Sequence, residues 1–441
     1  MKREMPDLRS FMPTLFSKPE ENAPETDSPK IRLGTNQKTG APVYWMPWER
    51  SQMHACVLGA PGTGKTQLIK SVIVQLLRQH RDMGILVLDF KGDYNESKPE
   101  FVEITQAKVR RIHQLALNPF TLEGAEPRAQ LHVHTAMNFA DAMAGSFNLD
   151  PIQKSTLVQS VMAAYARCGI TEDPKTWSRP APTFAQVHRE YLERPSSQHN
   201  DSLKHIMDNL SALELFEEGP GDTQDRYQNL QGVVVLDLSG YSESIKKLAA
   251  MLLLSKFCDR MAVSPPEEGL RKLVLVDEAD DILSRSCPVL TRIIREGKDQ
   301  GVGVMLSARY PDFLQTMGFD CREHMQLWLL HYVEELRRSE LEYILRAEPF
   351  DPSVDQLYHS LRQLERNESM LRLGDEEPML MENLPFHDIS TDTAQTYLRE
   401  AAPEPEEDIF AGMRELDVTH LEIFDLDEEI QLETLDIFEE M

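Results

Sequence analysis

Eight consecutive residues near the start of the chain have the composition of a phosphate-binding loop. They read Gly59-Ala60-Pro61-Gly62-Thr63-Gly64-Lys65-Thr66, directly after an apolar run. The glycines let successive backbone N–H groups turn toward an anion, the amine of Lys65 can reach β- and γ-phosphate oxygens, and the Thr66 hydroxyl is the expected Mg²⁺ ligand. A helical pattern that begins at Gln67 adds the positive end of a helix to the same site. The segment predicts binding of a nucleoside triphosphate, which we take to be ATP, with Mg²⁺.

A second segment has the residues that hydrolysis of such a ligand needs. The apolar run 273–276 is followed by Asp277 and Glu278. Carboxylates at the end of a buried strand face the crevice where ligands bind. We expect Asp277 to join the Mg²⁺ shell and Glu278 to orient and polarise the attacking water. A small-molecule kinase is disfavoured, because Glu278 directly after Asp277 is typical of enzymes that activate water.

The surrounding pattern predicts an α/β fold. Apolar segments that read as strands alternate with amphipathic helical segments, and the strand patterns are 84–89, 109–112, 233–238, 272–276 and 301–308. Continuous apolar strands suit a parallel sheet that is covered on both faces. We therefore predict a RecA-like P-loop ATPase core with a mainly parallel doubly wound sheet.

The chain divides into five predicted regions. In order they are a flexible arm (1–30), an ATPase core segment with the phosphate loop (31–124), a helical insertion (125–225), a second core segment with the carboxylate pair and a sensor strand (226–390), and an acidic, apolar tail (391–441). The arm and the tail are rich in charged residues and proline, a composition that favours disorder.

Charge and composition limit the possible binding partners and the cellular location of the protein. The net charge is −27, but residues 375–441 contain 22 acidic and two basic residues, so residues 1–374 carry only −7. This near-neutral core does not oppose DNA binding, although no dense basic cluster supports it. No apolar stretch is long enough for a membrane helix, and the five cysteines have no disulfide or zinc spacing. We expect a cytoplasmic protein without membrane contact.

Several motifs together narrow the family. Besides the loop and the carboxylate pair they are Asp89-Phe90-Lys91-Gly92-Asp93, Leu117-Asn118-Pro119-Phe120, Leu236-Asp237-Leu238-Ser239 and Gly301-Val302-Gly303-Val304. In this order the chain resembles the HerA/FtsK family of P-loop motor ATPases, which includes the conjugation ATPases. The resemblance implies a ring-forming homo-oligomer, usually a hexamer, that moves DNA with energy from ATP. The letters Asp277-Glu278-Ala279-Asp280 also spell a helicase box, but its companion motifs are missing.

The sequence departs from the family pattern at two positions that bear on catalysis. Family members often carry Thr-Gln after the Gly-Val-Gly-Val strand, whereas this chain has Ala308 and Arg309. Arg309 would replace a γ-phosphate-sensing glutamine, and a guanidinium can still bind phosphate. An arginine finger that reaches a neighbouring subunit is one interpretation of Arg295, and a solvated helix face is the other. Lys298 is a weaker candidate because an ammonium lacks the planar fork.

Two charged segments leave alternatives open. Asp89, Lys91 and Asp93 either contribute to the nucleotide site or form an ordinary charged turn. Residues 404–441 alternate carboxylates with large apolar side chains, a pattern typical of segments that fold on a partner. This tail is a docking peptide, a DNA mimic or a solubilising appendage, and its many apolar residues favour docking to a protein partner.

These observations predict an ATP-hydrolysing, helicase-like DNA translocase that acts as the motor subunit of a DNA-processing or antiviral genome-defence complex. The alternative is an NTPase switch that is regulated by protein partners and does not thread DNA. Stimulation of hydrolysis by DNA distinguishes the two.

Overall fold

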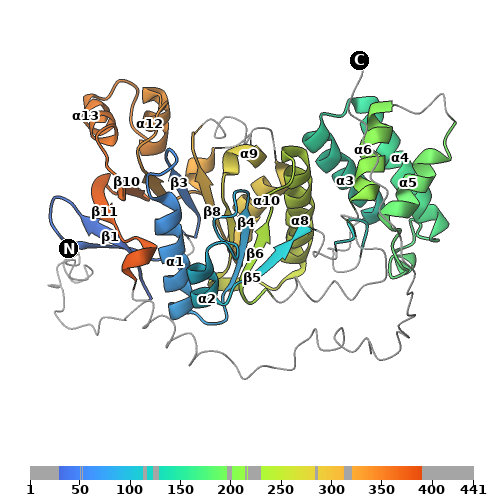
Figure 1. Cartoon of the computed structure of the whole chain (residues 1–441), viewed down its shortest axis with the longest axis horizontal. Helices are drawn as coiled ribbons and strands as arrows, with labels where there is room; N and C mark the ends of the chain where they lie inside the picture. Colours follow the sequence, from blue (N-terminus) through green and yellow to red (C-terminus); the bar gives the residue numbers. More distant parts are fainter. Residues whose placement is uncertain are drawn as a thin grey trace, which may run out of the picture. The chain divides into compact units, whose positions relative to one another are not determined.

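Figure 1 shows the protein as a computed structural model. It describes residues 29–389, apart from positions 50, 52, 113–116, 123–128, 196–200, 214–215, 217–229, 284–286 and 312–319. The predicted tail at 391–441 and nearly all of the predicted arm at 1–30 lie outside the described residues. The chain divides into two compact units, Met1–Leu398 and Arg399–Met441, and every described residue belongs to the first.

The strands form one eleven-stranded sheet in the order β2-β1-β11-β10-β9-β3-β8-β7-β4-β6-β5. They are β1 (Ile31–Asn36), β2 (Pro42–Trp45), β3 (Ala55–Leu58), β4 (Gly84–Asp89), β5 (Lys108–Arg111), β6 (Gly232–Asp237), β7 (Glu267–Val276), β8 (Gln300–Ala308), β9 (Leu327–Leu330), β10 (Glu368–Leu373) and β11 (Met379–Asn383). Neighbours from β9 to β5 pair in parallel, and those from β2 to β9 pair antiparallel. The predicted α/β fold with a mainly parallel sheet is confirmed, but β9, β10 and β11 have no counterpart in the prediction.

Helices connect the strands and cover both faces of the sheet. They are α1 (Lys65–Gln79), α2 (Pro99–Thr105), α3 (Leu131–Phe147), α4 (Pro151–Arg167), α5 (Phe184–Leu192), α6 (Asp201–Ala212), α8 (Glu243–Val263), α9 (Ala279–Leu283), α10 (Pro288–Glu296), α12 (Arg338–Leu345) and α13 (Pro352–Leu361). None of these helices is long and apolar enough to cross a membrane.

Alternation along the strands builds two apolar cores. In β3, Ala55 and Val57 join the core that contains the buried side of α1, whereas Cys56 and Leu58 join the core that contains α8 and α10. Side chains of successive strand residues point to opposite faces, so each buried strand supplies both cores. This arrangement is the doubly wound architecture that the continuous apolar strands predict.

The helices from α3 to α6 lie in sequence between β5 and β6, which are neighbours in the sheet. Helix α3 packs on α8, and the Lys256 ammonium on α8 donates a hydrogen bond of 2.7 Å to the Thr121 carbonyl oxygen. The segment between β5 and β6 therefore contacts α8. The division of the chain into core segments and an insertion at 125–225 stays a prediction.

Register brings the reactive segments to one edge of the sheet. Leu58 of β3 pairs with Ala308 of β8, and Val276 of β7 pairs with Leu306 of β8 and Leu88 of β4. The residues that follow these strands therefore emerge together at their carboxyl ends, where open α/β sheets bind ligands.

Candidate nucleotide-binding site

The phosphate loop has a shape that only glycine allows at one position. Gly64 has a φ of +105°, and a Cβ atom there would lie 2.3 Å from the Asn367 side-chain oxygen. The loop is also fixed from outside, because the Gly59 N–H donates to the Ala308 oxygen at 3.1 Å and the Ala60 N–H donates to the Tyr332 oxygen at 2.7 Å. The end of strand β8 and the segment after β9 therefore preorganise its backbone.

Lys65 turns its ammonium group into this loop. It donates hydrogen bonds to the carbonyl oxygens of Gly59 and Ala60, the second at 3.1 Å. Burial lowers the pKa of Lys65, while the charges of Glu278 and Asp277 act in the opposite direction. A buried cation beside turned backbone amides is an arrangement that attracts phosphate oxygens.

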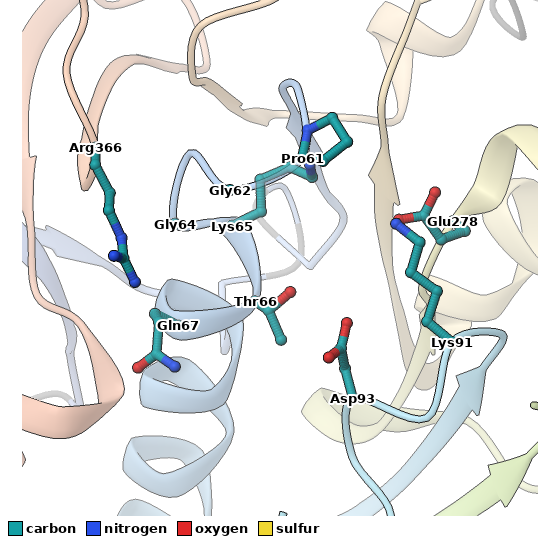
Figure 2. Close-up of a pocket in the computed structure, with 10 residues that line it drawn as sticks. All are labelled: Pro61, Gly62, Gly64, Lys65, Thr66, Gln67, Lys91, Asp93, Glu278 and Arg366. Carbon is teal, nitrogen blue, oxygen red and sulfur yellow. The ribbon is translucent and has the colours of Figure 1, made fainter.

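A cavity of about 300 Å³ lies over the loop and the start of α1. Its lining residues are Pro61, Gly62, Gly64, Lys65, Thr66, Gln67, Lys91, Asp93, Glu278 and Arg366. Figure 2 shows Lys65 and Thr66 between Arg366 on one side and Glu278 with Lys91 on the other. Most loop residues and Glu278 therefore meet at one cavity. Gly59, Ala60 and Thr63 do not line it, and the Thr63 hydroxyl donates to the Ala60 oxygen at 2.8 Å.

Glu278 has an unusual backbone and a restrained side chain. Its φ is +50°, in the left-handed region, which costs a residue with a side chain about 1–2 kcal/mol. The carboxylate is 5% exposed and forms ion pairs with Lys91 and with Arg309, whose Nε atom lies 3.0 Å from Oε2. Strain of this kind is concentrated at functional positions, and here it aims a carboxylate at the cavity.

Arg309 thus stands beside the carboxylate pair, although it does not line the cavity. Its Nε atom also lies 3.1 Å from the Asp280 side chain, and the Arg309 N–H donates to the same carboxylate at 2.9 Å. Asp280 therefore holds Arg309 in place, and Arg309 in turn contacts Glu278. This position links Arg309 to Glu278, and its sensing role stays a prediction.

Asp277 is buried and does not line the cavity. Burial raises the pKa of its carboxyl to about 7, and a hydrogen bond to Ser307 opposes that rise. A nearby cation stabilises the charged form of a buried carboxyl. Its chemistry therefore suits a metal shell, either directly or through water.

The side chains of the charged turn after β4 lie in two different surroundings. The Asp89 side chain accepts hydrogen bonds from the backbone N–H groups of Lys91, Gly92, Asp93 and Tyr94, at 2.8 to 3.2 Å. It shapes the turn from inside, and burial raises its pKa. Lys91 and Asp93 instead reach the cavity. The two interpretations left open by the sequence therefore apply to different residues of the same turn.

A comparison of the sequence with known families identifies the family of this chain. The family described as the central domain of helicase HerA matches residues 31–257, which is more than half of the chain. The chain belongs to the HerA central-domain family. This result confirms the resemblance to HerA-type ATPases that the motifs predict.

Other relatives of this HerA-family chain are distant. The DNA import protein CedB of Sulfolobus acidocaldarius is 19% identical over 359 residues, which cover 80% of the chain and 55% of CedB. The chain thus spans about half the length of this curated relative. VirB4 of Thermoanaerobacter pseudethanolicus has a TM-score of 0.59 and 15% identity, over 80% of this chain and 96% of VirB4. The unbound bacterial conjugative coupling protein TrwB has a TM-score of 0.52 and 12% identity, over 81% and 88% of the two chains. These structural likenesses show a shared fold.

The donor set of the HerA-family site fits ATP with Mg²⁺. A structure of TrwB with ADP and Mg²⁺ has a TM-score of 0.51 and 13% identity, over 81% of this chain and 88% of TrwB. In the described part of this chain, no group of three or more His, Cys, Asp or Glu side chains could hold a metal by itself. Mg²⁺ typically uses one or two protein oxygens together with phosphates and water. Thr66 and Asp277 are the residues that would hold it here.

The predicted arginine finger lies elsewhere. Arg295 is an exposed residue on α10 and does not line the cavity of its own chain. Its neighbour Ile294 is fixed by His54, whose Nε2 atom lies 2.8 Å from the Ile294 oxygen. The Lys298 ammonium donates to the His324 oxygen at 3.2 Å. An action of Arg295 on a neighbouring subunit remains a proposal.

The sequence interpretation did not include Arg366 in the site. Arg366 reaches the cavity from the segment before β10, about 300 positions after the loop. No motif surrounds it, and only the pairing of β10 and β11 with the rest of the sheet brings it close. Spacing along the chain therefore contains no signal that could have found it.

Proposed function

We propose that this protein hydrolyses ATP to move DNA, as the motor subunit of a DNA-processing or genome-defence complex. The observation that carries this proposal is the cavity in which the phosphate loop faces Glu278, in a chain of the HerA family. The name of CedB describes DNA import, and the name of TrwB describes a conjugative coupling protein. We infer a DNA substrate for this chain from the names of these two similar proteins.

The catalytic residues in and beside the cavity have distinct roles in this proposal. The loop amides and Lys65 bind the β- and γ-phosphates, and Thr66 with Asp277 holds Mg²⁺, which neutralises phosphate charge when bound. Glu278 orients the attacking water and takes up its proton. Arg309, which contacts Glu278, reports whether a γ-phosphate is present.

The test compares ATP turnover of the purified chain without DNA, with duplex DNA and with single strands. A motor should hydrolyse ATP faster on DNA, and Lys65→Ala should abolish nucleotide binding or turnover in all three conditions. Wild-type protein that binds no ATP would overturn the proposal as a whole. Turnover that no DNA changes would overturn its DNA part.

One observation favours a second candidate function. Residues 1–374 carry a net charge of only −7 and no dense basic cluster, so a DNA-binding surface is not evident from charge. An NTPase switch that is regulated by protein partners needs no such surface. In the same experiment, the switch predicts turnover that is insensitive to DNA and responds to a protein partner.

Assembly and location complete the proposal. We propose a homo-oligomeric ring, a hexamer as implied by the family, in which Arg295 contacts the γ-phosphate of the next subunit. The five cysteines are free, which fits a reducing compartment such as the cytoplasm. Negative-stain images with ATP and Mg²⁺ should show rings. A uniform population of monomers would contradict the proposed ring.

The segment 404–441 is proposed to dock a protein partner. Its alternation of carboxylates with Leu, Ile and Phe suits folding in a partner's groove. Deletion of residues 404–441 should abolish association with a co-encoded protein and leave basal ATP turnover unchanged. Unchanged association would leave only a solubilising role.

A further inference from the structure

Arg366 is a charged residue at the cavity that neither the motifs nor the family assignment explains. It lines the cavity together with Lys65, Thr66 and Gln67. Arg366 is exposed, and none of the hydrogen bonds or ion pairs among the described residues involves it. Lys65 is bonded to loop carbonyls and Lys91 is paired with Glu278. Among the cations that line the cavity, Arg366 is therefore the one without a hydrogen-bond or ion-pair partner in the described part of the chain.

The position of Arg366 is fixed by the next residue. The Asn367 N–H donates to the carbonyl oxygen of Thr63 in the loop at 2.9 Å, and the Asn383 N–H on β11 donates to the Asn367 oxygen at 2.8 Å. The Nδ1 atom of His331 also lies 3.2 Å from the Thr63 oxygen. The antiparallel strands are thus attached to the loop itself. This attachment holds the backbone of Arg366 at a constant distance from the phosphate site.

The orientation of a bound nucleotide follows from the two sides of the cavity. Glu278 and Lys91 lie on one side of Lys65 and Thr66, and Arg366 with Gln67 lies on the other (Figure 2). The terminal phosphate must face Glu278, because that carboxylate orients the attacking water. The rest of the triphosphate then passes over the start of α1 and leaves the cavity on the side of Arg366.

From these positions we infer that Arg366 binds the α-phosphate of the nucleotide. A guanidinium is always charged and matches phosphate oxygens with two parallel N–H groups. This inference rests on the proposed function, because it assumes that the cavity holds a nucleoside triphosphate. Arg366, in the segment before the antiparallel strand β10, is then a second phosphate-binding cation besides Lys65. It lies at the end of the phosphate chain opposite to Glu278.

The inference predicts a pattern of affinities for ATP, ADP and tripolyphosphate that substitution of other site residues should not produce. Arg366→Ala should weaken ATP and ADP to similar degrees, by about tenfold, because both contain the α-phosphate. It should also weaken inorganic tripolyphosphate, which has a phosphate in each of the three positions and no base. Binding is measured by calorimetry in the Glu278→Gln background with Mg²⁺. Arg366→Lys should recover part of the affinity, because it restores the charge without the fork.

Arg362→Ala is the matched control, since Arg362 is an exposed arginine four residues earlier that does not line the cavity. Equal affinities of the Arg366→Ala and Arg362→Ala variants would overturn the inference. Weakened ATP with unchanged tripolyphosphate would also overturn it, because Arg366 would then contact the base. Wild-type protein that binds no better than Lys65→Ala would show instead that the proposed function has failed. Unfolding midpoints of the Arg366 and Arg362 variants should agree, because both arginines are exposed.

Discussion

The Lys91 ammonium and the Glu278 carboxylate form an ion pair that joins the turn after β4 to the end of β7. The Lys91 side chain is 43% exposed, whereas that of Glu278 is 5% exposed. Arg309 approaches the other carboxylate oxygen at 3.0 Å. A nearly buried carboxylate between two cations keeps one orientation. Loss of either contact should therefore reduce the rate of hydrolysis more than the affinity for the nucleotide.

Glu278→Gln tests the role of the carboxylate itself. Glutamine keeps the shape of the side chain but cannot take up a proton from water. We expect turnover to fall by about 10²–10⁴-fold while ATP affinity changes little. Single-turnover hydrolysis and ATP binding are measured on the same preparation. Lys65→Ala, which should lose binding as well, is the comparison, and rapid hydrolysis by Glu278→Gln would exclude the assigned role.

Lys91→Ala tests the ion pair. Removal of the ammonium leaves Glu278 with one cation fewer, so its orientation should become less defined. We expect turnover to fall roughly 10- to 100-fold and the ADP affinity to stay unchanged, because a misplaced catalytic group costs about that much rate. Lys98→Ala is the control, because it alters an exposed lysine directly before α2 that does not line the cavity. Equal turnover of the two variants would show that the ion pair has no part in catalysis.

Arg309 offers a comparison between two replacements. Arg309→Gln introduces the residue that family members often carry at this position, and Arg309→Ala removes every polar group. We expect Arg309→Gln to keep more turnover than Arg309→Ala, because an amide can still contact the phosphate and Glu278. Turnover at saturating ATP is the measurement. A glutamine variant as slow as the alanine variant would show that the guanidinium itself is required.

Much of the site could be predicted from the sequence because its main parts are local. The loop from Gly59 to Thr66 encodes its turn through glycines, and Asp277 with Glu278 directly follows an apolar strand. The parallel strands place both segments at one edge of the sheet, as continuous apolar runs indicate. Local chemistry together with one rule of sheet topology is enough to bring Lys65 and Glu278 to the same cavity.

The remaining parts depend on tertiary contacts that spacing does not encode. Arg366 reaches the cavity only because β10 and β11 extend the sheet and Asn367 bonds to the loop. Asp89 and Lys91 belong to one charged turn, but one side chain folds back onto backbone amides while the other reaches Glu278. Sequence alone cannot separate them, because the direction of a side chain depends on its surroundings.

His54 predicts how stability depends on pH. Its Nδ1 atom accepts from the Val304 N–H at 2.9 Å and its Nε2 atom donates to the Ile294 oxygen at 2.8 Å, so the folded state needs the neutral ring. Its pKa is lowered from 6.5 to about 3, mainly by burial and also by the nearby charges of Lys298 and His324, while the hydrogen bond to Ile294 opposes this shift. Since only the unfolded chain takes up the proton between these values, this contribution is complete above pH 6.5 and is lost as the pH falls toward 3. Each such histidine should cost about 2 kcal/mol of unfolding free energy between pH 6.5 and 5.

The comparison of variants isolates this histidine from the others. His54→Gln should lower the urea midpoint at pH 7, because a glutamine cannot bridge both partners, and should also show a smaller loss between pH 7 and 5 than wild type. His331, whose burial likewise lowers its pKa to about 3, keeps its own contribution in that variant. His359→Gln, which changes an exposed histidine on α13, should keep the wild-type pH dependence. If stability depends on pH to the same degree in His54→Gln and wild type, His54 accepts a proton in the folded state. The contact that His54 makes between β8 and α10 would then not require a neutral ring.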